Sequence, residues 1–370
     1  MTGDPGPAAQ LGFHSNMCLP TEQTNDGSDP SAQLLFVGSP GRPPWRARYE
    51  PGSGTPPARG FAGSRAGPVS GGLSEVVHSI GVWAPTAVIE GEGGWLSFEV
   101  PARGIRGTMS RVVVEGRSIA YDRYSGSGEA LVFVHGWCCG RWAFAPQVAH
   151  FLARGHQVLT LDLPGHGDSD PLGGPPTMGS LASAVAATMA AVGIDRAVVV
   201  GHSMGAATAL VLAKHTPDVV KAVVAVDPAP MVARFGDLEP IAGANAAFHA
   251  DDATRTAVFQ AFVEGFFHPV AAESIKQLAV REMTGAPADT MLRCWEAMFE
   301  MDGPAVLAEV RCPVLHVAAT PPLNPVDTFA SMVSDCTTGC TVGAGHFAQL
   351  EVPDQVNSMI DHFLLALSAR

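Results

Sequence analysis

Positive charge is scarce in this sequence. Of its 370 residues, 22 are lysine or arginine and 35 are aspartate or glutamate, which gives a formal net charge of −13 at pH 7. Only three are lysines, and Lys214, Lys221 and Lys276 are far apart in the chain. Because proteins that bind nucleic acids contact phosphates through clustered lysine and arginine, we expect no nucleic-acid partner.

Long hydrophobic runs are also missing. No apolar stretch approaches the roughly 20 residues that a helix needs to cross a bilayer, so we expect no membrane span. Residues 1–5 (MTGDP) lack the basic start and the apolar core of a signal peptide, and we therefore expect a cytoplasmic protein. The composition, 46% hydrophobic and 15% charged, is sufficient for a large core.

Cysteine is present, but its spacing is not typical of a disulfide-stabilised protein. The seven cysteines are odd in number and scattered, so they do not resemble a small disulfide framework or a zinc site. We expect no pairing between Cys336 and Cys340, and we expect no metal and no organic cofactor. Cys138 and Cys139 are predicted to be small buried residues, with a place in the pocket wall as the alternative.

The first part of the chain lacks periodic apolar residues and is rich in helix and strand breakers. Segments such as 39–44 (SPGRPP) and 51–57 (PGSGTPP) cannot bury enough surface to offset the entropy lost on ordering. We therefore predict that residues 1–108 form a low-complexity, disordered extension. Residues 109–370 are predicted to be the folded domain, because Met109 opens a regular apolar pattern (MSRVVVEG).

A motif at residues 198–205 (VVVGHSMG) points to nucleophilic catalysis. A β-branched run ends in Gly-x-Ser-x-Gly, and a helical pattern follows at once. Such a sharp strand-to-helix turn exposes the hydroxyl of Ser203, and Gly201 and Gly205 remove Cβ atoms that would clash in it. The start of the helix would also present the backbone N–H of Met204 to a developing oxyanion.

Two further segments supply what this serine requires. Residues 131–137 (LVFVHGW) are typical of a buried strand that ends in a turn, and the N–H of Trp137 would be the second oxyanion donor. Residues 342–347 (VGAGHF) place His346 in a glycine-rich loop just before a final amphipathic helix. A base in this position suits the chain order nucleophile, acid, histidine.

With these motifs, and with residues 161–169 (LDLPGHGDS), the sequence resembles the α/β-hydrolase superfamily from about residue 109 to the end. The resemblance implies an eight-stranded, mostly parallel sheet with helices on both faces and a helical cap after the sixth strand, at about residues 228–308. We place strands near 112–115, 118–123, 131–135, 157–162, 197–202, 222–227, 313–318 and 339–342. We place helices near 143–154, 177–193, 203–215 and 353–368.

The acid of the triad departs from the commonest family pattern. Most relatives carry an aspartate in a turn after the seventh strand, but Pro322 occupies that place here. Some branches of the superfamily carry the acid after the sixth strand, where this chain has Asp227. The spacing from Ser203 fits that arrangement, so we predict Asp227 as the acid. Asp327 and a dyad without a carboxylate remain the alternatives.

The predicted function is hydrolysis of a carboxylic ester through an acyl-enzyme intermediate. Phenylalanine and methionine at helical spacing in the cap favour a hydrophobic or aromatic small-molecule substrate. Hydrolysis of a lactone or of a carbon–carbon bond by the same triad stays open. An alternative from another class is a weakly catalytic ligand-binding receptor on a hydrolase scaffold. The sequence does not indicate an oligomeric state.

Overall fold

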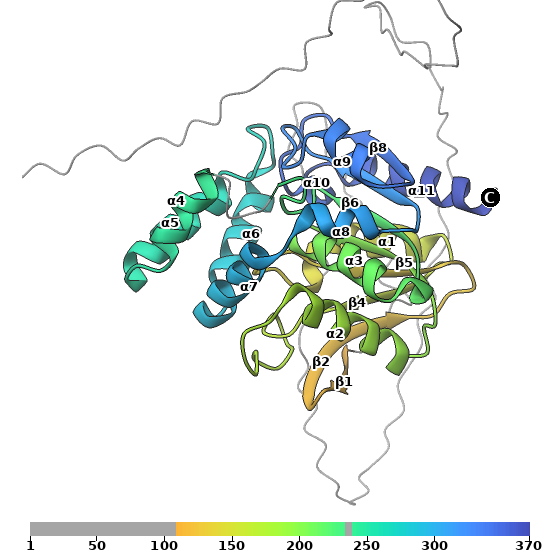
Figure 1. Cartoon of the computed structure of the whole chain (residues 1–370), viewed down its shortest axis with the longest axis horizontal. Coiled ribbons are helices and arrows are strands. Elements are labelled where there is room, and N and C mark those ends of the chain that lie inside the picture. Colours follow the sequence, from red (N-terminus) through yellow and green to blue (C-terminus); the bar gives the residue numbers. More distant parts are fainter. Residues whose placement is uncertain (1–108, 234–238) are drawn as a thin grey trace, which may run out of the picture. The chain divides into compact units, whose positions relative to one another are not determined.

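The computed structural model describes residues 109–233 and 239–370 (Figure 1). Its first described residue, Met109, is also the first residue of strand β1. The predicted low-complexity extension, residues 1–108, lies outside the described residues. Its disorder and the domain boundary at residue 109 therefore stay predictions.

Within the described residues, eight strands form one sheet in the order β1-β2-β4-β3-β5-β6-β7-β8. β1 and β2 run antiparallel to their neighbours, and all other pairs are parallel. The predicted eight-stranded, mostly parallel sheet is thus confirmed. The strands are β1 Met109–Val114, β2 Arg117–Tyr124, β3 Ala130–Val134, β4 Gln157–Leu161, β5 Ala197–His202, β6 Val220–Val226, β7 Val314–Ala318 and β8 Cys336–Cys340.

The central strands are apolar on both faces, as expected for a parallel sheet that helices cover on both sides. Along β5, Val199 packs into one hydrophobic cluster, while Val198 and Val200 pack into another on the opposite face. β3 alternates in the same way, with Val132 on the first side and Phe133 on the second. The period of two along each strand therefore divides the core into two layers.

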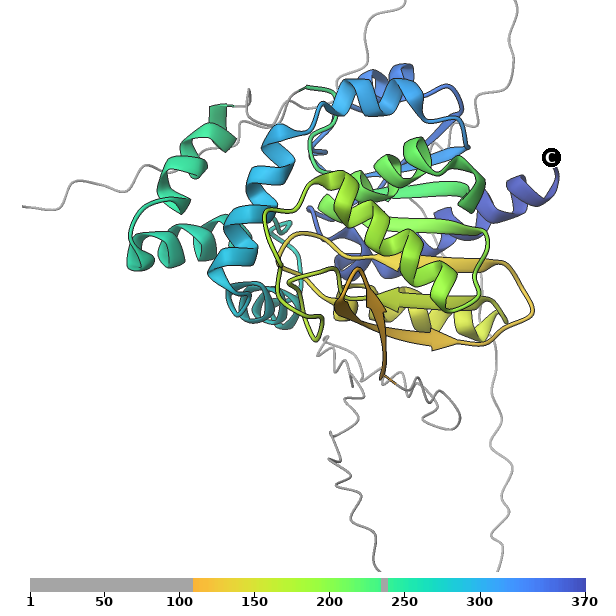
Figure 2. The same cartoon turned by 60° about the horizontal axis from the view of Figure 1, so that its bottom comes forward.

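Helices cover both clusters. The first cluster packs against α2 and α3, which lie side by side in Figure 2, and against α8 and α9. The second packs against α1, α10 and α11. The helices of the described part are α1 Ala145–Ala153, α2 Met178–Ala191, α3 Met204–His215, α4 Glu239–Phe248, α5 Asp252–Glu264, α6 Glu273–Thr284, α7 Ala288–Glu300, α8 Gly303–Glu309, α9 Val326–Met332, α10 Ala348–Glu351 and α11 Pro353–Ser368; two short 3₁₀ turns are Arg141–Phe144 and Pro217–Val219.

Helices α4–α8 lie between β6 and β7 in the chain and span residues 239–309, close to the predicted cap segment 228–308. They are called the inserted helices below. Both views show α4–α7 gathered at one end of the sheet (Figures 1 and 2). Trp137, from the loop after β3, packs its ring against Phe259 of α5 and Trp295 of α7. Its indole N–H donates to the carbonyl of Met291 at 2.8 Å. One aromatic side chain of the sheet domain thus holds two inserted helices.

The predicted last strand, 339–342, is displaced in the structure. β8 covers Cys336–Cys340, and Val342 lies beyond it with its side chain 78% exposed. β8 is an edge strand with a half-exposed sequence (CTTGC), so it lacks the buried apolar run that locates the inner strands. The predicted strand was therefore placed too late in the chain.

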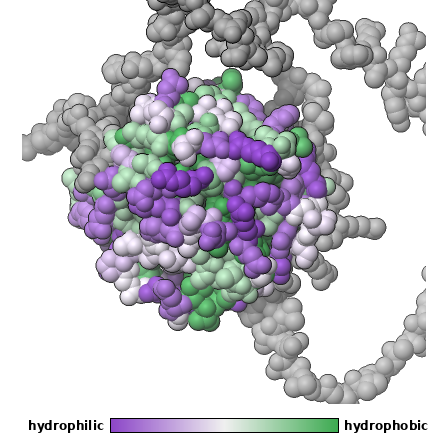
Figure 3. Space-filling view, turned by 45° about the vertical axis from the view of Figure 1, so that its right-hand side comes forward, coloured by the Kyte–Doolittle hydropathy of each residue, from purple (hydrophilic) through white to green (hydrophobic). Residues whose placement is uncertain are grey.

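The surface of the described part carries few large apolar side chains. Those most exposed are isolated in the sequence: Val113, Val270, Val342 and Leu365. Figure 3 shows hydrophilic and hydrophobic residues interspersed on one face. Among the described helices, none combines the length and the apolar character that crossing a membrane requires.

Candidate active site

Ser203 lies at the junction between β5 and α3, as the motif predicts. Its backbone is left-handed, with φ of 54°, which an L-residue adopts rarely and at a cost. Cβ atoms at Gly201 and Gly205 would overlap neighbouring backbone atoms, so both glycines are required for this turn. The Ser203 N–H donates to the carbonyl of Val226 at 3.1 Å, which ties the turn to the end of β6.

The residue that follows β6 is Asp227, and it contacts His346. The Asp227 Oδ2 atom accepts a hydrogen bond from His346 Nδ1 at 2.6 Å, and both side chains are buried. Because a carboxylate only accepts, Nδ1 is the donor in this bond, and Nε2 is the ring nitrogen that can serve as a base. The structure thus joins two residues that are 119 positions apart in the chain.

The other carboxylate oxygen of Asp227 is held by the backbone after β7. Its Oδ1 atom accepts from the N–H of Leu323 at 3.2 Å and from the N–H of Ala319 at 3.4 Å. Asp327, the alternative acid, lies in the first turn of α9 and is exposed. The loop after β7, where most relatives carry the acid, here supplies N–H donors to the carboxylate of Asp227.

Trp137 and Met204, the predicted oxyanion donors, flank Ser203. Met204 is the first residue of α3, and the first N–H groups of a helix have no acceptor within it. Trp137 follows Gly136, whose added Cβ would lie 3.3 Å from the Cβ of Ser203. The loop after β3 therefore passes directly over the serine.

Two buried histidines hold this loop. The His166 Nε2 atom accepts from the N–H of Cys138 at 3.2 Å, and His135 Nε2 accepts from the N–H of Leu163 at 2.9 Å. Burial lowers the pKa of His135 to about 4 and that of His166 to about 3. Both rings are therefore neutral at pH 7 and can accept these bonds. His166 therefore holds the loop after β3 through its bond to the Cys138 N–H.

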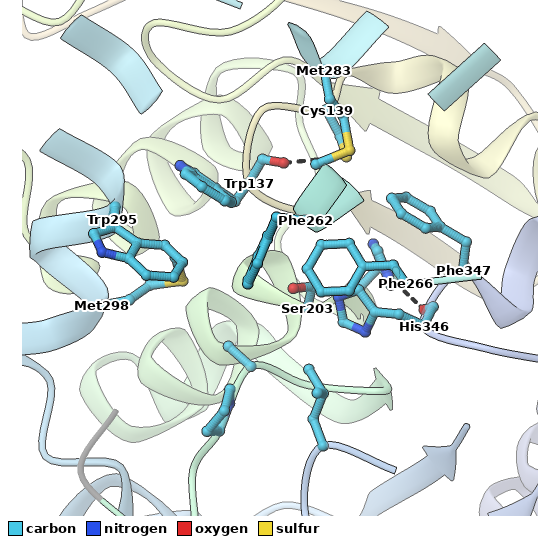
Figure 4. A pocket seen from close by; sticks show the side chains of 14 residues that line it. Trp137, Cys139, Ser203, Phe262, Phe266, Met283, Trp295, Met298, His346 and Phe347 are labelled. Carbon is cyan, nitrogen blue, oxygen red and sulfur yellow. Dashed lines mark hydrogen bonds between the residues drawn. The ribbon is translucent and has the colours of Figure 1, made fainter. Parts of the chain in front are cut away.

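The serine and the histidine open into one cavity of about 50 Å³ (Figure 4). Its walls are almost entirely apolar and come mostly from the inserted helices and from the loops after β3 and β8. Figure 4 shows Ser203 beside the imidazole of His346, near the rings of Phe262 and Phe266. The other wall residues include Trp137, Cys139, Met283, Trp295, Met298 and Phe347.

Among the described residues, Cys336 forms no disulfide bond, so it is not bridged to Cys340. Cys138 and Cys139 are both buried, as predicted, and Cys139 also lines the cavity, which was the alternative prediction. Over residues 109–233 and 239–370, no group of three or more histidine, cysteine, aspartate or glutamate side chains could hold a metal ion.

One site residue was not singled out from the sequence. His202, next to the serine, donates from Nε2 to the carbonyl of His346 at 2.9 Å, and the two imidazole rings lie 4.6 Å apart. Burial holds the pKa of His202 well below its usual value, so this ring is neutral. The sequence signal was its position inside the Gly-x-Ser-x-Gly motif, but the motif does not show which loop the ring would contact.

An eight-stranded, mostly parallel sheet covered by helices, with helices inserted between β6 and β7, is the fold of α/β-hydrolases. Residues 131–359 match the pattern of the family described as "Alpha/beta hydrolase family". The chain belongs to this family.

Relatives of known activity match only in part. The chain is 39% identical over 126 residues to the dihydrolipoyllysine-residue acetyltransferase component of the acetoin cleaving system of Cupriavidus necator, a match that covers 34% of this chain and 32% of that protein. It is 34% identical over 123 residues to a 2-hydroxy-6-oxo-6-phenylhexa-2,4-dienoate hydrolase of Burkholderia cepacia. This match covers 32% of this chain and 43% of that protein. The matches thus span less than half of these relatives.

Solved structures resemble a larger share of the chain. Est816, described as an N-acyl homoserine lactone degrading enzyme, has 25% sequence identity and a TM-score of 0.61, covering 69% of this chain and all of that one. An esterase from Exiguobacterium antarcticum has 18% sequence identity and a TM-score of 0.62, and the likeness covers 69% of this chain and 99% of that one. The second likeness concerns the fold alone.

Proposed function

We propose that this protein is a serine hydrolase that cleaves a carboxylic ester of a hydrophobic or aromatic small molecule. The observation that carries the proposal is the buried 2.6 Å bond from His346 to Asp227, made beside a serine with left-handed backbone in the same cavity. A nucleophile, a base and a group that orients the base are the three parts that such chemistry needs.

Acylation begins with proton transfer from Ser203 Oγ to His346 Nε2 while the oxygen attacks the ester carbonyl carbon. Asp227 holds the ring in the required tautomer and stabilises the imidazolium that forms. The tetrahedral intermediate collapses when its carbon–oxygen bond to the alcohol breaks, and the alcohol leaves with the proton from His346. A water molecule then repeats these steps, releases the acid and restores the serine.

The negative charge that develops on the carbonyl oxygen is stabilised by the N–H groups of Trp137 and Met204. One such donor lowers the activation barrier by about 3 kcal/mol in enzymes where its effect has been measured. These donors are backbone groups held by β3 and α3, so their orientation costs no reorganisation during the reaction.

The cavity lining supports a neutral, apolar substrate. Its side chains are mainly aromatic rings and methionines, and none of them is a lysine or an arginine. A cavity of about 50 Å³ holds only a few water molecules. The inserted helices, which act as the cap in this proposal, therefore have to move apart to admit a bulky ester.

Two related reactions are supported by the comparisons. The relative from Burkholderia cepacia hydrolyses a dienoate, and Est816 is described as degrading a lactone. A dienoate carries a carboxylate, and the described cavity wall offers no cationic side chain to pair with it. A lactone is a neutral cyclic ester, so it suits this cavity better and is the second candidate substrate.

Hydrolysis of p-nitrophenyl esters of increasing acyl length tests the proposal, with wild type and Ser203→Ala compared. We expect turnover by the wild type and its loss in the variant, and apolar acyl groups should react faster than charged ones. If the wild type cleaves lactones or carbon–carbon bonds but no linear ester, the substrate assignment is wrong. Tight binding of an apolar ester without turnover would instead favour the receptor.

A further inference from the structure

The loop that carries His346 is bonded to one segment of the inserted helices. The N–H of His346 donates to the carbonyl of Phe266 at 2.7 Å, and the ring of Phe266 lies 4.6 Å from the imidazole. Next to this pair, the rings of Phe267 and Phe347 stack at 5.0 Å with 9° between their planes. Residues 266–268, just after α5, therefore lie directly against the histidine loop.

The carboxylate of Glu351 joins the two segments. Its Oε2 atom accepts from the N–H of Gly345 at 3.1 Å and from the N–H of His268 at 3.0 Å. Its Oε1 atom accepts from the N–H of Phe347 at 3.2 Å. Three backbone donors therefore converge on one half-buried side chain: two flank His346, and the third belongs to the segment after α5.

The backbones of the two segments approach closely at Gly345. A Cβ atom on Gly345 would overlap the carbonyl oxygen of Phe266, so only glycine fits at this contact. Bonds to a charged acceptor are roughly twice as strong as neutral ones. The docking of residues 266–268 and the position of the histidine loop are therefore held by the same carboxylate.

We propose that Glu351 is a positioning residue that makes the placement of His346 depend on the docking of residues 266–268. This inference rests on the proposed function for its effect on turnover. His346 has to keep its bond to Asp227 while Nε2 faces Ser203, and a shift of about 1 Å at a catalytic group costs about 100-fold in rate. When the segment after α5 is docked, the base is aligned; when it undocks, the base is displaced.

A purely local role for Glu351 makes a different prediction. Glu351 ends α10, and its bond to Phe347 at the start of that helix is a local cap. A cap alone would stabilise residues 347–351 without any effect on the inserted helices. The bond to the His268 N–H, 83 residues away in the chain, is the contact that distinguishes the two roles.

The test uses the full chain with Glu351→Gln and Glu351→Ala, and Glu309→Gln as the matched control. Glu309 is an exposed glutamate at the end of α8, and its ion-pair partner is Lys214 of α3 at 3.1 Å. Neither residue belongs to the histidine loop or to residues 266–268. We expect kcat for a short p-nitrophenyl ester to fall about 10-fold in the glutamine variant and about 100-fold in the alanine variant, with KM within about twofold. Amide hydrogen exchange should accelerate in peptides that cover 265–268 and 345–347, and the control should change neither measurement.

Two results would overturn the proposal. One is an unchanged kcat in Glu351→Gln, and the other is faster exchange at 345–347 with no change at 265–268, since that is the signature of a local cap. If the alanine variant does not fold, the glutamine variant decides. If the wild type hydrolyses no ester, the proposed function fails, whereas the exchange at 265–268 still decides whether Glu351 couples the two segments.

Discussion

At the scale of single residues, the site depends on which carboxylate faces the histidine. Asp227 is buried, receives two backbone N–H groups on one oxygen and binds His346 with the other. Asp327 is exposed on α9. The two residues therefore offer a matched pair of substitutions.

Asp227→Asn should lower kcat by about 10⁴-fold, the loss seen when the carboxylate of such a triad becomes an amide. The reason is that an amide no longer fixes the tautomer of His346 or stabilises its cation. Asp327→Asn should leave the rate of ester hydrolysis within about twofold of wild type. Steady-state kinetics on one ester settles the assignment, and a collapse of the Asp327 variant alone would reverse it.

His316 makes a second prediction at this scale. Its side chain on β7 is fully buried against Phe329, with ring centroids 4.2 Å apart, and neither ring nitrogen has a hydrogen-bond partner. An unsatisfied buried polar group costs about 1–3 kcal/mol. We therefore expect His316→Leu to raise the unfolding free energy by about 1 kcal/mol in urea titrations. A large loss of stability would show that the ring has a partner, such as a buried water.

At the scale of elements, the packing of α3 against β3 fixes the turn that carries Ser203. A Cβ on Gly205 would overlap the carbonyl oxygens of Val134 and His135, which are backbone atoms and cannot rotate away. Gly205→Ala should therefore cost about 3 kcal/mol of stability or more, at the upper end of the range for overpacking, because backbone atoms would have to move. Gly174→Ala, where an added Cβ meets nothing within 4 Å, is the control and should be neutral by thermal unfolding.

Under the proposed function, the inserted helices limit the length of the acyl group that fits in the cavity. Phe262 of α5 lines the cavity, so Phe262→Ala should widen it and shift the preferred acyl chain of p-nitrophenyl esters to greater length. The expected change is a several-fold gain in kcat/KM for long chains relative to short ones. Val270→Ala, at a side chain that is 74% exposed, should leave the chain-length profile unchanged. An unaltered profile in Phe262→Ala would place the acyl group elsewhere.

At this scale too, the sequence predicted some elements better than others. Inner strands such as β5 were located because a buried parallel strand is a continuous β-branched run. The edge strand β8 carries no such signal. The spacing from Ser203 favoured Asp227, but Asp327 stayed open as an alternative because the choice depends on how the loop after β7 folds. Glu351 was missed for the same reason, since its bond to the His268 N–H crosses 83 residues.

At the scale of the whole molecule, buried neutral histidines make stability depend on pH. Burial lowers the pKa of His135 to about 4, of His166 to about 3 and of His316 to about 4, from an ordinary value of 6.5. Between pH 6.5 and about 4 the unfolded chain therefore binds more protons than the folded one. The contribution of these neutral rings to the unfolding free energy is fully present above pH 6.5. It falls as the pH decreases through this window, by up to about 1.4 kcal/mol per pH unit for each histidine.

Urea unfolding at pH 7.5, 6.0 and 5.0 checks this dependence. We expect the unfolding free energy to decrease at each step. The decrease should be smaller in His316→Leu, because this variant removes one of the four histidines, His202 included, whose pKa is lowered by burial. A free energy that is constant from pH 7.5 to 5.0 would show that these rings are protonated in the folded state or that solvent reaches them.

Detection of the covalent intermediate is the most direct test of the central claim, that Ser203 is a nucleophile activated by His346 and Asp227. Wild-type protein would be mixed with a p-nitrophenyl ester, quenched in acid within the first turnovers, digested and analysed by mass spectrometry. The account predicts an acyl group on the peptide that contains Ser203, and neither adduct nor turnover in Ser203→Ala. Rapid turnover by Ser203→Ala, or an acyl group on another residue of the wild type, would contradict it.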